Sequence, residues 1–145
     1  MADDTGVSVL RREEGESLAI MGAPMVVKSD GASSGVFVAE HVIPPGYGVP
    51  LHVHERDEEM FYLLEGELTL QDEAGERRAG AGSFVSLPRG VPHAFRNDGP
   101  ADARFLVVTC PGVAAAEMFR QFDRAGSPAP EDIGAISAQY GVVMR

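Results

Sequence analysis

The chain has 145 residues, of which 44% are hydrophobic, which is typical of a single globular domain with its own core. Its formal net charge of −10 would be repelled by nucleic acids and by anionic membranes, so we expect neither as a partner. No apolar run reaches the roughly 18 residues of a membrane span, and the first residues lack the features of a signal peptide, so we expect a cytoplasmic protein.

The first third of the chain contains short strand-like segments separated by charged or glycine-rich turns. We expect strands at residues 7–10, 17–20, 25–28 and 36–43. The last of these leads into Pro44, Pro45 and Gly46, where a strand must end.

The middle of the chain continues in the same way. Further strands are expected at residues 67–71, 77–79, 83–87, 93–96 and 103–109, with turns between them. Many short strands with frequent turns indicate an all-β fold, either an antiparallel sandwich or a small barrel. Cys110, the only cysteine, is expected at a strand end and cannot form an internal disulfide.

The last third is predicted to be helical. A first helix over residues 114–125 carries an apolar stripe, and a second begins near Pro130 and ends at Gly141. The stripe either docks the helix on a sheet or covers one mouth of the barrel and lines a pocket; it consists of Ala115, Met118, Phe119 and Phe122. We expect a single domain over residues 1–145, with a β-barrel core at about 7–110 and a helical segment at about 113–141.

Candidate metal ligands occur in residues 46–66. His52 and His54 are one residue apart, so on a strand they point to the same face with Cβ atoms about 7 Å apart. The polar residues 55–58 indicate a loop, and Glu59 opens the next apolar run. The chain can therefore fold back and bring a carboxylate beside the two imidazoles.

A second segment, residues 82–97, can supply a fourth ligand. Pro88 and Gly90 mark a turn between two strand-like runs. His93 begins the second run and alternates in facing with Phe95 and Asn97.

Together the two segments resemble the two sequence motifs of the cupins. The first motif, G-x5-H-x-H-x4-E-x6-G, is matched by Gly46, His52, His54, Glu59 and Gly66. The second motif, G-x5-P-x-G-x2-H-x3-N, is matched by Gly82, Pro88, Gly90, His93 and Asn97. The resemblance implies a double-stranded β-helix (a jelly-roll barrel) with one or two C-terminal α-helices, and it implies a homodimer.

The same resemblance implies a metal site formed by His52, His54, Glu59 and His93. The competing interpretation is a cupin that keeps these residues but works without a metal. The fourth histidine, His41, has no partner at ligand spacing and is interpreted as a surface or hydrogen-bonded residue. The motif glycines are expected to serve backbone geometry, and Asn97 is expected to be structural.

Three imidazoles and one carboxylate suit one divalent transition metal ion per chain. Four protein ligands would leave an octahedral ion two open positions, for substrate and dioxygen. We therefore expect Fe, Mn or Ni if the protein is a dioxygenase, and Zn remains open for non-redox chemistry.

The expected function is that of a metal-dependent enzyme acting on a small aromatic or enolisable substrate. The first hypothesis is a dioxygenase of the quercetin dioxygenase type, with Glu59 as the catalytic proton acceptor. Phe61, Leu63 and Phe95 are candidate pocket residues, although they would equally suit an ordinary barrel core. The alternatives are a non-redox cupin (a polyketide cyclase or an isomerase) and a non-catalytic small-molecule-binding module.

Overall fold

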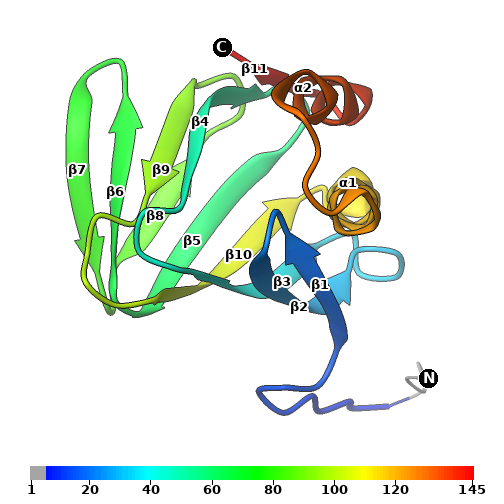
Figure 1. The fold of residues 1–145 in the computed structure, drawn as a ribbon. Helices are drawn as coiled ribbons and strands as arrows, with labels where there is room; N and C mark the ends of the chain where they lie inside the picture. Colours follow the sequence, from blue (N-terminus) through cyan, green and yellow to red (C-terminus); the bar gives the residue numbers. More distant parts are fainter. Residues whose placement is uncertain (1–5) are drawn as a thin grey trace.

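The computed structural model describes residues 6–145 and contains two antiparallel sheets that face each other, with two helices on one side (Figure 1). The strands are β1 (Glu16–Ile20), β2 (Ala23–Asp30), β3 (Phe37–Ile43), β4 (Gly48–His54), β5 (Glu58–Glu65), β6 (Glu67–Asp72), β7 (Gly75–Gly80), β8 (Phe84–Leu87), β9 (His93–Arg96), β10 (Ala103–Cys110) and β11 (Val142–Met144). The helices are α1 (Val113–Ala125) and α2 (Pro130–Gln139). The predicted all-β fold with C-terminal helices is confirmed.

The order of the strands brings distant parts of the chain together. One sheet has the order β1-β2-β3-β10-β5-β8, and the other has the order β11-β4-β9-β6-β7. Along β3 and β10 every second residue is buried, and the residues between them are half exposed or exposed. This alternation turns one face of the sheet toward the second sheet, and the core forms between the two inner faces.

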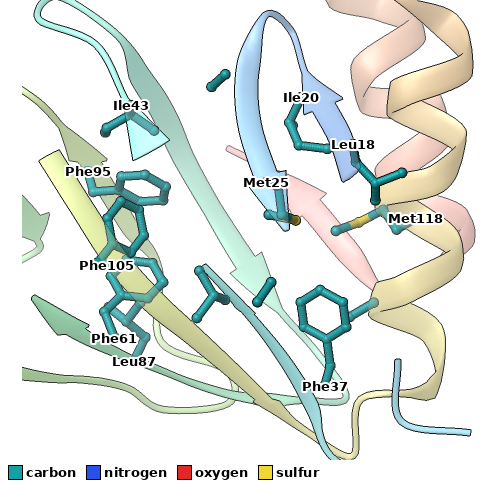
Figure 2. Close-up of a cluster of buried hydrophobic side chains, with 14 of the residues drawn as sticks. Leu18, Ile20, Met25, Phe37, Ile43, Phe61, Leu87, Phe95, Phe105 and Met118 are labelled. Carbon is teal, nitrogen blue, oxygen red and sulfur yellow. The ribbon is translucent and has the colours of Figure 1, made fainter. Parts of the chain in front are cut away.

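Aromatic side chains fill much of this core. Phe61, Phe95 and Phe105 come from three strands of the two sheets and gather in one group (Figure 2). The ring centroid of Phe61 lies 4.8 Å from that of Phe105 and 5.2 Å from that of Phe95. Aromatic rings in contact prefer tilted and edge-to-face arrangements, and this packing holds the three rings in place.

Helix α1 packs on the sheet at β1, β2 and β3. It buries Met118 and Phe122, four residues apart on one face, as the apolar stripe predicted. Arg120 on another face of α1 donates hydrogen bonds to Glu16 of β1 at 2.8 Å and to Asp30 of β2 at 3.2 Å. Apolar and ionic contacts therefore both hold α1 against the first two strands.

Helix α2 begins at Pro130, a residue suited to the first turn because its missing N–H would have no helical partner there. The hydroxyl of Tyr140 donates a hydrogen bond to Oε1 of Gln121 at 2.7 Å and so links the end of α2 to α1. Among residues 6–145, no helix has the length and apolar character needed to cross a membrane.

The structure differs from the sequence prediction at both ends. Residues 7–10 form no strand, and Val7 and Val9 are 99% and 72% exposed. Alternation alone does not make a strand where no neighbouring strand edge pairs with the segment. The first sheet therefore begins at Glu16 rather than near residue 7. At the other end, the unpredicted strand β11 pairs with β4, with Val142 opposite His54.

Asn97 and Gly66 have the structural roles expected of them. The Asn97 side chain is fully buried, donates to the carbonyls of Ile43 and Ala101 at 3.0 and 2.9 Å, and accepts from the Gly99 N–H at 2.9 Å. The four motif glycines all have positive φ; they are Gly46, Gly66, Gly82 and Gly90. At Gly66 a Cβ atom would lie 2.5 Å from the Asp102 carbonyl, so this turn also needs glycine for space.

Candidate metal centre

The structure brings four side chains together inside the barrel. His52 and His54 lie on β4, Glu59 on β5 and His93 on β9. One potential ligand atom from each lies within 4.8 Å of those of the other three, and all four residues are buried. These four residues, called the histidine-glutamate cluster below, could hold a metal ion.

Strand pairing explains the convergence. His52 is the register partner of His93 in the pair β4–β9, and their ring centroids are 4.4 Å apart. Glu59 comes from β5 in the opposite sheet, reached by the turn that follows His54. The cluster therefore bridges the two sheets. The spacing along the sequence predicted that His52, His54 and Glu59 would meet, but it could not place His93 beside them.

Backbone carbonyls determine which ring nitrogens carry protons. Nδ1 of His52 bonds to the Pro50 carbonyl at 2.8 Å, and Nδ1 of His93 bonds to the Val91 carbonyl at 3.1 Å. A carbonyl oxygen only accepts, so each Nδ1 must carry the proton, and in the neutral ring Nε2 then carries a lone pair. This is how metal-binding histidines are oriented in proteins.

The inner atoms of the cluster lack protein partners. Nε2 of His54 and Nε2 of His93 are buried without a hydrogen-bond partner, at 3.6 and 3.7 Å from Oε1 of Glu59. In the neutral form of His93, Nε2 offers only a lone pair toward a carboxylate oxygen 3.7 Å away. Buried polar atoms are rarely left unpaired, and a cation shared by these atoms would satisfy them. The donor set of three imidazoles and one carboxylate therefore fits a divalent transition metal.

Burial and proximity set the protonation of the cluster. Burial lowers the pKa of His52 to about 4, and the nearby His93 ring contributes in the same direction. For Glu59, burial works against the charged form, but the imidazoles of His54, His93 and His52 outweigh it and hold the pKa of the carboxyl below its usual value. At neutral pH His52 is neutral and Glu59 is ionised, which are the forms that bind a metal.

The shift at His52 predicts a pH dependence of the metal-free protein. The folded state binds this proton less tightly than the unfolded chain, whose imidazole has a pKa near 6.5. Unfolding therefore takes up a proton below pH 6.5, and the free energy of unfolding should fall by about 3 kcal/mol between pH 6.5 and pH 4, then level off for this group. Urea unfolding of chelator-treated protein at several pH values measures the effect.

A His52→Gln variant is the control for this prediction. It lacks the titrating ring, so its free energy of unfolding should fall less than that of the wild type over the same pH range. An identical pH dependence in both proteins would show that other groups cause it.

A cavity of about 430 Å³ opens beside the cluster, and His52, His54 and Glu59 form part of its wall. Of the predicted pocket residues, Phe61 and Phe95 line it. Leu63 does not: it is fully buried in the core two residues beyond Phe61 on the same strand face, which fits the alternative of an ordinary core residue. The remaining wall is largely apolar, and it includes Met25, Phe105 and Val107.

Both helices contribute to the cavity wall. Met118, Phe119 and Phe122 of α1 line it, together with Pro130 and Ile133. Met118 and Phe122 are also buried against the sheet, as Figure 2 shows for Met118 beside Met25 and Leu18. The apolar stripe therefore docks the helix on the sheet and also lines the cavity, because the same side chains do both.

Sequence reasoning missed His41 as a cavity residue. His41 is 5% exposed, lines the cavity, and bonds through Nδ1 to the Pro24 carbonyl at 2.8 Å. The expectation of a hydrogen-bonded residue is thus met, but the ring also faces the candidate site. The signal was present in the alternation of residues 36–43, which puts His41 on the same inner face as Ala39 and Ile43.

Comparison with known proteins finds a matching family model and several relatives. The sequence profile of the cupin domain matches residues 39–109. An oxalate-binding protein from Thermotoga maritima is 36% identical over 66 residues, which are 46% of this chain and 54% of that protein. A quercetin 2,3-dioxygenase from Bacillus subtilis is 30% identical over 90 residues, 61% of this chain but 27% of that protein. The chain thus matches about half of the length of the first of these curated relatives and about a quarter of the length of the second.

A solved structure from Silicibacter pomeroyi, described as a sugar phosphate isomerase of the cupin superfamily, has a similar fold. It superimposes with a TM-score of 0.64 at 27% identity, covering 71% of this chain and 75% of that one. The matching profile, the shared fold and the two complete motifs around the histidine-glutamate cluster show that this chain belongs to the cupin superfamily.

Proposed function

We propose that the protein is a metal-dependent dioxygenase of the quercetin dioxygenase type, acting on a flat, enolisable aromatic substrate. The observation that carries the proposal is the position of the histidine-glutamate cluster on the wall of a largely apolar cavity of about 430 Å³. That volume is in the range of small-molecule sites, about 300–1,000 Å³. The relative from Bacillus subtilis that bears this activity in its name supports the choice.

The cavity wall favours a planar aromatic ligand. Phe61, Phe95 and Phe105 belong to the lining of the cavity, and aromatic ligands pack on such rings with offset or edge-to-face geometry. A sugar phosphate would instead need cationic groups for its phosphate. Within the described part of the cavity wall, Arg145 is the one arginine or lysine. An isomerase of sugar phosphates is therefore less well supported by this wall.

The residues of the site would divide the work as follows. His52, His54, His93 and Glu59 would hold the metal, which when bound would supply Lewis acidity and a centre for reaction with dioxygen. Glu59, ionised at neutral pH, would accept the proton of the substrate's enolic hydroxyl. The phenylalanine rings would orient the substrate, and α1 and α2 would keep bulk water from the reacting atoms.

Oxygen uptake tests the proposal. Protein loaded with iron, manganese or nickel is mixed with flavonols, β-diketones and catechols, and an oxygen electrode records consumption while chromatography records substrate loss. We expect at least one enolisable aromatic compound to be consumed with a matching uptake of dioxygen. Substrate loss without oxygen uptake would identify non-redox chemistry such as cyclisation or isomerisation, and binding without turnover would identify a binding module. Either result would refute the proposal that the protein is a dioxygenase.

A further inference from the structure

We propose that His41 forms a second polar contact in the cavity, accepting a hydrogen bond from a hydroxyl at the end of the substrate remote from the histidine-glutamate cluster. The inference rests on the proposed function and makes the substrate class more specific. The expected ligand is an elongated polyphenol, with a chelating enol at one end and a phenolic hydroxyl at the other.

The sheet register places His41 two strands away from Glu59 in the same sheet and cavity, and the charge of Glu59 still acts on the His41 ring by raising its pKa against the larger lowering by burial. His41 on β3 pairs with Phe105 on β10, and Phe105 pairs with Leu63 on β5, four residues after Glu59. Strand spacing then puts the Cα atoms of His41 and Glu59 on the order of 15 Å apart. In the register, Phe105 lies between His41 and Leu63, and Phe61 lies between Leu63 and Glu59 along β5; the rings of Phe61 and Phe105 lie side by side (Figure 2).

The hydrogen bond of His41 determines what its free nitrogen can do. Nδ1 bonds to the Pro24 carbonyl at 2.8 Å, so Nδ1 carries the proton and the neutral ring offers a lone pair at Nε2. No hydrogen-bond partner for Nε2 is found among residues 6–145. Burial lowers the pKa of the ring, which keeps it neutral at pH 7. His41 is therefore an acceptor that selects a ligand N–H or O–H.

Two hydroxyl groups of the cavity wall are already engaged as donors. The Tyr47 hydroxyl donates to the Ile20 carbonyl at 2.6 Å, and the Ser137 hydroxyl donates to the Ile133 carbonyl at 2.8 Å. Both residues line the cavity, but neither has a second proton to give to a ligand. These two hydroxyls and Nε2 of His41 can therefore only accept a hydrogen bond from a ligand, which suits a ligand hydroxyl at any of the three.

A cycle of ligands and variants tests the inference. Two flavonols share the 3-hydroxy-4-keto chelating group, and one of them has an additional hydroxyl on the ring system at the opposite end. Their Kd values are measured by anaerobic absorbance titration of the metal-loaded protein, so that no turnover intervenes. We expect the wild type to prefer the hydroxylated flavonol about tenfold, as one hydrogen bond to a buried acceptor allows.

The variants separate ligand recognition from packing. His41→Asn keeps a donor near the position of Nδ1 for the Pro24 carbonyl but removes Nε2, so the preference should fall below about twofold. His41→Gln places an amide near the position of Nε2 and should restore part of the preference for the hydroxylated flavonol. An equal loss of affinity for both flavonols would show a structural role and overturn the inference. If neither flavonol binds the wild type, the proposed substrate class is wrong, and the proposed contact of His41 with that substrate is refuted as well.

Discussion

Replacing His52 and His54 with alanine should abolish metal binding. The wild type, purified without an affinity tag and reconstituted, should contain about one divalent transition metal ion per chain by elemental analysis, and the double variant should contain close to none. The reason is geometric: the variant loses both ligands of β4 and leaves only Glu59 and His93, and two ligands hold such an ion weakly.

The same variant should lose the stabilisation that metal gives the wild type. A ligand at 100 times its Kd adds about 2.7 kcal/mol to the free energy of unfolding, which for a domain of this size raises Tm by roughly 5–10 °C. The wild type should show this rise on addition of metal, and the double variant should show none. The chelator-treated proteins give the baseline for each comparison.

His41→Asn is the matched control, because it changes a buried histidine that lies on β3 outside the cluster. It should retain the full metal content and the metal-dependent rise in Tm. Retention of one ion per chain by the His52→Ala/His54→Ala protein would show that the ion binds elsewhere, and the metal centre would have to be abandoned. Loss of the ion in the His41→Asn control would instead show that it depends on the fold around the cavity.

The positions of His52, His54 and Glu59 could be predicted because they depend on local rules. The shared facing of His52 and His54 follows from the period of a strand, and the turn after His54 returns the chain toward Glu59. His93 required the motif resemblance, since its place opposite His52 depends on the pairing of β4 with β9, about 40 residues later in the chain. Local patterns carry no information about such a pairing.

The features that sequence reasoning missed depend on long-range contacts. Strand β11 has only three residues and forms because the edge of β4 is available to it, so no periodic pattern announces it. Leu63 shares the strand face of Phe61, but the cavity ends before reaching it. Which inward residues line a cavity and which fill the core is decided by how the opposite sheet and the helices pack, and alternation cannot separate the two.

The chemical step should depend on the carboxylate of Glu59. A Glu59→Gln variant keeps a side chain of the same size and one carbonyl oxygen for the metal, but an amide cannot accept the substrate proton. For the substrate identified by oxygen uptake, kcat should fall about 10²- to 10⁴-fold, the usual contribution of a positioned proton acceptor. Steady-state oxygen uptake at saturating substrate measures the change.

If Glu59 is the proton acceptor, the Glu59→Gln variant should still bind metal and substrate although its kcat falls. Elemental analysis should find the Gln variant still loaded with metal, and anaerobic titration should find substrate bound within about tenfold of the wild-type Kd, because the apolar wall at Phe61 and Phe95 is unchanged. A substrate that binds as its anion changes its absorption spectrum, and the variant should show this change only at higher pH, since no side-chain carboxylate takes the proton. A kcat within about tenfold of the wild type, at full metal content, would place the proton acceptor outside the histidine-glutamate cluster.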